Sequence, residues 1–164
     1  MTMLILSIDP GITNCGVVVL FWDNTDKIAR IIYSNTIWFS ANTSINWFKT
    51  QKKINKSLKA ILSLHNVDLI TIETQPNIIR NNMQSRYNAI NITVENSLIQ
   101  FAICHSIPLL GTLPCNWHSK FKVPGRKHIS KYKAQNFMFK MENRHLLEDV
   151  HCYDALLIAM WHFV

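Results

Sequence analysis

The sequence has little of what marks disordered, fibrous or membrane-spanning chains. Only 16% of its 164 residues are charged, and it has four glycines and five prolines. Together with 48% hydrophobic residues, this composition excludes a disordered chain and also a collagenous or low-complexity one. No apolar run reaches the roughly 18 residues of a membrane-spanning helix, so we expect no membrane partner. The length and the apolar content instead predict a single domain over residues 1–164.

Acidic residues are scarce, which leaves the chain basic. Ten aspartates and glutamates stand against 17 lysines and arginines, so the formal net charge is +7. A basic domain of this size favours a polyanionic partner, most often nucleic acid, although many basic proteins bind none. The four cysteines show no CxxC spacing, and the start of the chain shows no secretory signal. We therefore expect reduced, buried cysteines in a cytoplasmic protein, with a viral or organellar DNA compartment as the alternative.

Apolar runs separated by turn residues predict five strands. The first three runs cover residues 3–8, 16–22 and about 29–39, and the short polar turns between them indicate an antiparallel meander. Two later runs, Val67–Glu73 and Ile107–Leu113, predict two further strands.

Helical spacing of apolar residues marks the segments between and after these later strands. It predicts helices over about 43–65 and 83–101, and the apolar stretch 153–164 predicts a buried last helix. Strands first, then helices alternating with strands, indicate an α/β fold with a five-stranded mixed sheet whose first three strands are antiparallel.

Three acidic residues fall where burial is expected. Asp9 ends the first predicted strand, Glu73 ends the fourth, and Asp154 lies in the apolar last helix. A buried carboxylate without a partner costs several kcal/mol, so each needs a cation, a hydrogen-bond donor or a raised pKa. One solution gathers all three around divalent metal ions.

Each acid also has a structural interpretation. Asp9 could shape the turn that follows it or cap a helix. Glu73 could pair with Arg80 or Arg86 at a strand end. Asp154 could face solvent in the first turn of its helix, where the helix dipole would stabilise it. Taken together these alternatives weaken, because all three acids lie at element ends that a sheet could bring together.

A histidine and a further acid accompany Asp154. His151 lies three residues earlier, so the two side chains share a helix face. Its imidazole could be a fourth metal ligand, a proton carrier or a satisfied structural side chain. Asp149 is about 140° away from Asp154 around the helix, which makes it a weaker candidate.

Basic residues gather in two segments. One segment has no acid and comprises Lys120, Lys122, Arg126, Lys127, Lys131, Lys133 and Lys140. The other lies on one face of the predicted helix over 43–65 and comprises Lys49, Lys52, Lys53, Lys56 and Lys59. Both could contact phosphates without sequence preference, and the second is equally well explained as a solvated surface. The residues that we expect to bind DNA are Arg80, Arg86, Lys120, Lys122, Arg126, Lys127, Lys131 and Lys133.

Three motifs occur in order along the chain: S-I-D-P-G-I-T-N-C-G (Ser7–Gly16), I-E-T-Q-P-N (Ile72–Asn77) and H-C-Y-D-A-L (His151–Leu156). They resemble the motifs of the RuvC-type Holliday-junction resolvases, endonucleases of the RNase H-like superfamily that cut four-way DNA junctions. The residues Glu73–Asn77, followed by Arg80–Met83, are more similar to the mitochondrial and poxvirus branch than to the bacterial one. The resemblance spans nearly the whole chain and implies an RNase H-like fold with helices on both faces of the sheet.

The resemblance also implies the metal site. Asp9, Glu73 and Asp154 would be catalytic carboxylates that bind two Mg²⁺ ions, for which Mn²⁺ would substitute, and His151 would complete the set. The commonest family pattern has aspartate at the position of His151, so this chain departs from it there. A histidine ligand would make metal binding more sensitive to acid.

The resemblance further implies catalytic lysines and a homodimer in which each subunit cuts one strand. Lys120 and Lys133 are our candidates near the scissile phosphate, and the predicted helix over 83–101 is the candidate interface. Three other functions stay open at this point. They are another RNase H-like nuclease acting on RNA, hybrids or transposon ends, a non-catalytic nucleic-acid-binding module, and an actin-like ATPase domain.

Overall fold

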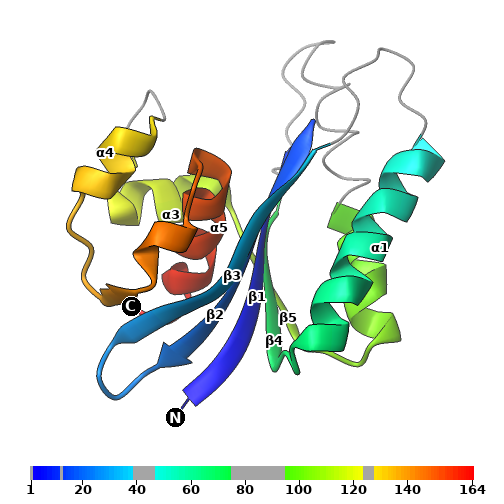
Figure 1. Ribbon diagram of the computed structural model, residues 1–164, viewed down its shortest axis with the longest axis horizontal. Helices are drawn as coiled ribbons and strands as arrows, with labels where there is room; N and C mark the ends of the chain where they lie inside the picture. Colours follow the sequence, from blue (N-terminus) through cyan, green and yellow to red (C-terminus); the bar gives the residue numbers. More distant parts are fainter. Residues whose placement is uncertain (1, 12, 39–46, 75–94, 124–127) are drawn as a thin grey trace.

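The computed structural model describes residues 2–11, 13–38, 47–74, 95–123 and 128–164. In this part of the chain a six-stranded sheet lies between two groups of helices (Figure 1). The strands are β1 (Thr2–Pro10), β2 (Asn14–Asp23), β3 (Ile28–Trp38), β4 (Leu69–Glu73), β5 (Leu109–Thr112) and β6 (Lys140–Glu142). The helices are α1 (Trp47–Leu64), α3 (Pro114–Phe121), α4 (Ile129–Ala134) and α5 (Val150–Trp161), with a 3-10 turn, η1 (Arg144–Leu146).

The sheet has the order β5-β4-β1-β2-β3-β6. β1, β2 and β3 form the expected antiparallel meander, and β4 and β5 add to it in parallel on the β1 side. The predicted mixed α/β sheet is therefore confirmed. The short strand β6 was not predicted; it pairs in parallel with the start of β3 and makes the sheet six-stranded.

Helices cover both faces of the sheet, as expected (Figure 1). α3, α4 and α5 lie on one face, and α1 lies on the other with a second helical segment, residues 95–104. The predicted helix over 83–101 falls partly on residues 75–94, which lie outside the described residues, and its interface role stays a prediction. The last helix begins at Val150, three residues before the predicted start.

Alternate residues of the central strand β1 face opposite layers. Leu6 and Ile8 belong to the core beneath α1, whereas Ile5 belongs to the core beneath α5. Successive side chains of a strand point to opposite faces, so Ser7 and Asp9 share the α5 face with Ile5. This alternation decides on which side of the sheet the candidate site forms.

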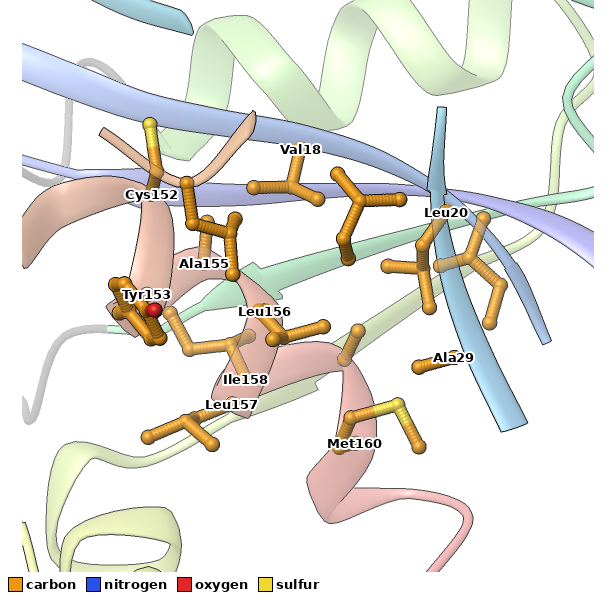
Figure 2. Close-up of a cluster of buried hydrophobic side chains, with 14 of the residues drawn as sticks. Val18, Leu20, Ala29, Cys152, Tyr153, Ala155, Leu156, Leu157, Ile158 and Met160 are labelled. Atoms are coloured by element: carbon orange, nitrogen blue, oxygen red, sulfur yellow. The ribbon is translucent and has the colours of Figure 1, made fainter. Parts of the chain in front are cut away.

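Helix α5 is the centre of one of the two cores. Its residues from Cys152 to Met160 are all buried, which explains why this stretch is apolar almost throughout. Figure 2 shows Leu156 and Ile158 of α5 in the same cluster as Val18 and Leu20 of β2. A helix enclosed in this way holds its polar residues in fixed positions relative to the sheet.

The structure tests two further predictions, that the cysteines are reduced and buried and that no helix spans a membrane. All four cysteines are free; Cys15 and Cys152 are buried, as expected, but Cys104 and Cys115 are exposed, so the expectation of four core cysteines is wrong. Within the described residues, no helix is both long and apolar enough to cross a membrane.

Candidate active site

Asp9 and Glu73 lie at the carboxyl ends of two neighbouring parallel strands. β1 and β4 pair Ser7 with Thr71, and the two hydroxyl oxygens are 2.7 Å apart. Asp9 and Glu73 each follow two residues later, so both carboxylates lie on the same face of the sheet as these hydroxyls. Adjacent strands are about 4.8 Å apart, and each acid is only 9% exposed. The sheet therefore holds two nearly buried carboxylates next to each other.

Helix α5 brings Asp154 to this face. The Ser7 hydroxyl donates to the carbonyl oxygen of Ala155 at 2.5 Å, so the second turn of α5 lies directly on β1. Asp154 is 1% exposed, and the interpretation that it faces solvent is wrong. Burial, followed by the negative charges of Asp154 and of Asp9, raises the pKa of the Tyr132 phenol. Asp154 is therefore buried on the α5 side of the sheet, the side that Asp9 also faces.

The start of α5 is fixed to the sheet by a helix cap and a close contact. Asp149 is the N-cap: it accepts a hydrogen bond from the Cys152 amide at 2.9 Å and another from the Thr36 hydroxyl. Gly16, the β2 partner of Asp9, lies beneath His151, and a Cβ at Gly16 would be 2.2 Å from the His151 carbonyl oxygen. Asp149 thus has a structural role, and the glycine lets α5 approach Asp9.

Two aromatic residues donate hydrogen bonds to the buried acids. The indole N–H of Trp117 in α3 donates to Glu73 Oε2 at 2.8 Å. The phenol of Tyr132 in α4 donates to Asp154 Oδ1 at 2.5 Å. Both aromatic residues are fully buried, so they set the orientation of the carboxylates. Sequence reasoning missed both, because no motif surrounds either residue.

His151 lies against Asp9 and completes this side of the site. Its Nδ1 is 3.6 Å from Asp9 Oδ2, and its Nε2 is 3.2 Å from the Asn14 side-chain nitrogen. Its contact with Asp9 raises the pKa of His151 above the usual value, although partial burial opposes the rise. Asp9 is followed by a strand, so the interpretation that it caps a helix is wrong. Asn14 was also missed, although it belongs to the first motif.

The donor chemistry of these acids fits Mg²⁺. Among the residues that the structure describes, no three histidine, cysteine or acidic side chains are already arranged to hold a metal ion. The acids nevertheless offer hard carboxylate oxygens on one face of the sheet, which Mg²⁺ prefers. A carboxylate offers about four lone-pair sites, so a hydrogen bond from Trp117 or Tyr132 does not by itself exclude metal ligation. Asp9, Glu73 and Asp154 therefore supply the ligand type that Mg²⁺ takes, from one face of the sheet.

The predicted basic residues lie at different distances from this site. The Lys120 ammonium lies 4.8 Å from the centre of the Trp161 ring. Trp161 is seven residues after Asp154, which is about 10 Å along the axis of α5. The structure therefore does not bring Lys120 to the carboxylates. Lys131 and Lys133 are exposed on either side of Tyr132, and Lys122 is exposed after α3. The remaining predicted DNA-binding residues, outside the described part of the chain, are Arg80, Arg86, Arg126 and Lys127.

No protein-family model and no curated protein matches the sequence. Solved structures do match its fold. RuvC of T. thermophilus, in complex with a Holliday junction substrate, is 17% identical, with 98% of this chain and 92% of that chain covered and a TM-score of 0.68. The yeast mitochondrial Holliday junction resolvase Ydc2 is 17% identical, with 96% and 76% covered and a TM-score of 0.62. Fowlpox virus resolvase, in complex with its Holliday junction DNA, is 16% identical, with 97% of each chain covered and a TM-score of 0.54. The chain therefore has the RNase H-like fold that these three resolvases share.

Proposed function

We propose that this chain is a structure-selective endonuclease that resolves four-way DNA junctions by Mg²⁺-dependent phosphodiester hydrolysis. It would act as a single domain in a homodimer, each subunit cutting one strand. The observation that carries the proposal is the gathering of Asp9, Glu73 and Asp154, all nearly buried, on one face of an RNase H-like sheet. The similarity in fold to three junction resolvases supports the choice of substrate.

The three acids would hold the metal ions at the carboxyl end of β1 and β4. Two divalent ions bound there would supply an activated water and stabilise the departing 3′ oxygen. Trp117 and Tyr132 would keep Glu73 and Asp154 oriented during this reaction, since each donates to one of those carboxylates. His151 would orient Asp9 and hold or release a proton beside it.

Exposed basic residues near the acids would hold the DNA. Lys131 and Lys133 flank Tyr132, the residue whose hydroxyl reaches Asp154. Ammonium groups at such positions neutralise phosphates and release counterions, which gives affinity that does not depend on base sequence. We propose Lys133 as the catalytic lysine in preference to Lys120, whose ammonium lies at the other end of α5.

Cleavage of a synthetic four-way junction tests the proposal. We expect the wild-type protein to nick opposing strands with Mg²⁺ or Mn²⁺ and to cut linear duplex and RNA–DNA hybrid much less. Asp9→Asn should lower the cleavage rate by about 10²-fold or more, the scale on which the loss of one electrostatic contact acts, while junction affinity stays near wild type. Asp26→Asn is the matched control, because it makes the same change in charge at an exposed turn.

Two outcomes would contradict the proposal. Cleavage by Asp9→Asn at the wild-type rate would mean that the metal site lies elsewhere. Junction binding without cleavage under any divalent ion would instead favour a non-catalytic binding module. Sedimentation analysis of the protein tests the homodimer separately, and a monomer at micromolar concentration would contradict that part.

A further inference from the structure

A large aromatic side chain beside the candidate active site is exposed. Trp38 is the last residue of β3, and 57% of its surface is accessible. Trp22 and Trp117, by contrast, are 1% and 0% exposed. An indole offers a large apolar area that is most often buried in a core or an interface. The exposure of Trp38 therefore points to a ligand surface at the end of β3.

The indole lies next to the proposed catalytic residues. Its ring centre is 6.1 Å from that of the His151 imidazole, and the two planes are perpendicular. The same imidazole contacts Asp9 through its Nδ1. A perpendicular contact covers at most one face of the indole, which agrees with the large accessible surface of Trp38. Only the His151 side chain thus links Trp38 to Asp9.

A lysine accompanies the indole. The ammonium of Lys53 in α1 donates a hydrogen bond to the Trp38 carbonyl oxygen, which holds a positive charge at the backbone of the same residue. Lys53 is exposed. An aromatic face next to a cation is the combination with which proteins bind single-stranded nucleic acid, since bases stack on the ring and phosphates contact the cation.

We propose that Trp38 and Lys53 form a subsite for one unstacked nucleotide of the DNA strand that reaches the carboxylates. Its base would stack on the Trp38 indole, and its phosphate would contact the Lys53 ammonium. This inference rests on the proposed function, because the carboxylates decide which strand reaches the subsite. Bases in an intact duplex are already stacked on their neighbours, so the occupant comes from a junction centre or a single strand.

Substitution of Trp38 tests the stack. Binding of a labelled four-way junction and of a single-stranded oligonucleotide is measured by anisotropy in EDTA, where no hydrolysis occurs. We expect Trp38→Ala to weaken both about 5- to 150-fold, the range for the loss of one base–aromatic stack, and to leave binding of intact duplex unchanged. Trp38→Phe keeps an aromatic face and should stay within about threefold of wild type. Met138→Ala, at a residue that is 64% exposed near the start of β6, is the apolar control.

Salt dependence separates the roles of the two residues. Lys53→Gln should reduce the slope of log affinity against log salt concentration by about 1, because one phosphate contact is lost. Trp38→Ala should leave that slope unchanged, since stacking releases no counterions. Lys27→Gln removes the same charge at the opposite end of β3, in the exposed turn before it, and should change neither affinity nor slope.

The results distinguish this inference from the proposed function. If the wild-type protein cuts junctions but Trp38→Ala binds them as Met138→Ala does, the subsite is wrong and the nuclease proposal stands. If Trp38→Ala loses single-strand binding but no variant or wild-type protein cuts a junction, the subsite stands and the nuclease proposal fails. Equal loss of duplex and single-strand binding by Trp38→Ala would also overturn the subsite.

Discussion

At the scale of single residues, the site depends on the hydrogen bonds that its buried carboxylates accept. Tyr132 donates to Asp154, which is 1% exposed. Tyr132→Phe removes this donor, and we expect a loss of about 1.5–3 kcal/mol in unfolding free energy in EDTA, the usual value for a hydrogen bond to a buried charged group. Urea denaturation measures this loss. Tyr33→Phe is the control, because this substitution also removes a phenol hydroxyl, but on the α1 side of the sheet.

A positioning role for Tyr132 predicts a second effect, on metal affinity. If the phenol orients Asp154 for metal ligation, Tyr132→Phe should also bind Mn²⁺ more weakly than wild type in calorimetry, whereas a purely structural role would leave that affinity unchanged. Wild-type stability of Tyr132→Phe in EDTA would contradict the prediction, since it would mean that the donor contributes nothing to the folded state.

His151 makes the stability of the metal-free protein depend on pH. Its contact with Asp9 raises the pKa of His151 in the folded state above the value of about 6.5 expected for the unfolded chain. The stabilisation is therefore full below about pH 6.5 and is lost as the pH rises through the folded pKa. His151→Gln should flatten this dependence when urea unfolding is compared between pH 5.5 and 8.5 in EDTA. His145→Gln, at an exposed position, is the control, and an unchanged profile in His151→Gln would contradict the assignment.

The acids could be located from the sequence, but their partners could not. Asp9, Glu73 and Asp154 each interrupt an apolar stretch, so the pattern of residues alone indicates their burial and its energetic cost. Trp117 and Tyr132 carry no such signal, because an aromatic residue in an amphipathic segment is ordinarily interpreted as core. Their contacts join residues 44 and 22 positions apart, and only the packing of α3 and α4 against the sheet decides them.

At the scale of elements, the position of α5 depends on Gly16 in β2. A Cβ at this position would be 2.2 Å from the backbone carbonyl oxygen of His151. A backbone atom cannot avoid this contact by a change of rotamer, as a side chain can. We expect Gly16→Ala to destabilise the protein by about 1–3 kcal/mol, the usual cost of overpacking, and to disturb the His151 signals in NMR spectra. At Gly111 the nearest atom is the Thr74 methyl group, 2.4 Å from the added Cβ. Because a side chain can rotate, Gly111→Ala should cost less, and equal costs would contradict this account.

The elements themselves show where sequence patterns carry information. β1 to β5 were predicted because each is an apolar run of four or more residues bounded by turns. β6 has three residues, Lys140–Glu142, with two charges, and it exists because the chain passes beside the open edge of β3. The last helix begins three residues before its predicted start, because Asp149 caps it. The residues around Asp149 did not indicate this role.

At the scale of the whole molecule, the two basic surfaces lie on opposite faces of the sheet. Lys131 and Lys133 are on α4, on the side of the carboxylates, whereas Lys56 and Lys59 are on α1, on the other side (Figure 1). DNA that reaches the carboxylates approaches the α4 side, and on α1 we expect it to contact only Lys53, at the Trp38 carbonyl oxygen. We therefore expect the double variant K131Q/K133Q to reduce the salt slope of junction binding by about 1 for each lysine that contacts a phosphate.

The matched double variant K56Q/K59Q makes the same change in net charge and should leave the slope nearly unchanged. Long-range attraction alone cannot produce a difference between the two pairs, because charges beyond about 10 Å are largely screened at 0.1 M salt. Anisotropy titrations from 50 to 300 mM salt would measure both slopes in EDTA. If K56Q/K59Q reduced the slope more than K131Q/K133Q, DNA would bind mainly along α1, and its placement on the α4 side would be wrong.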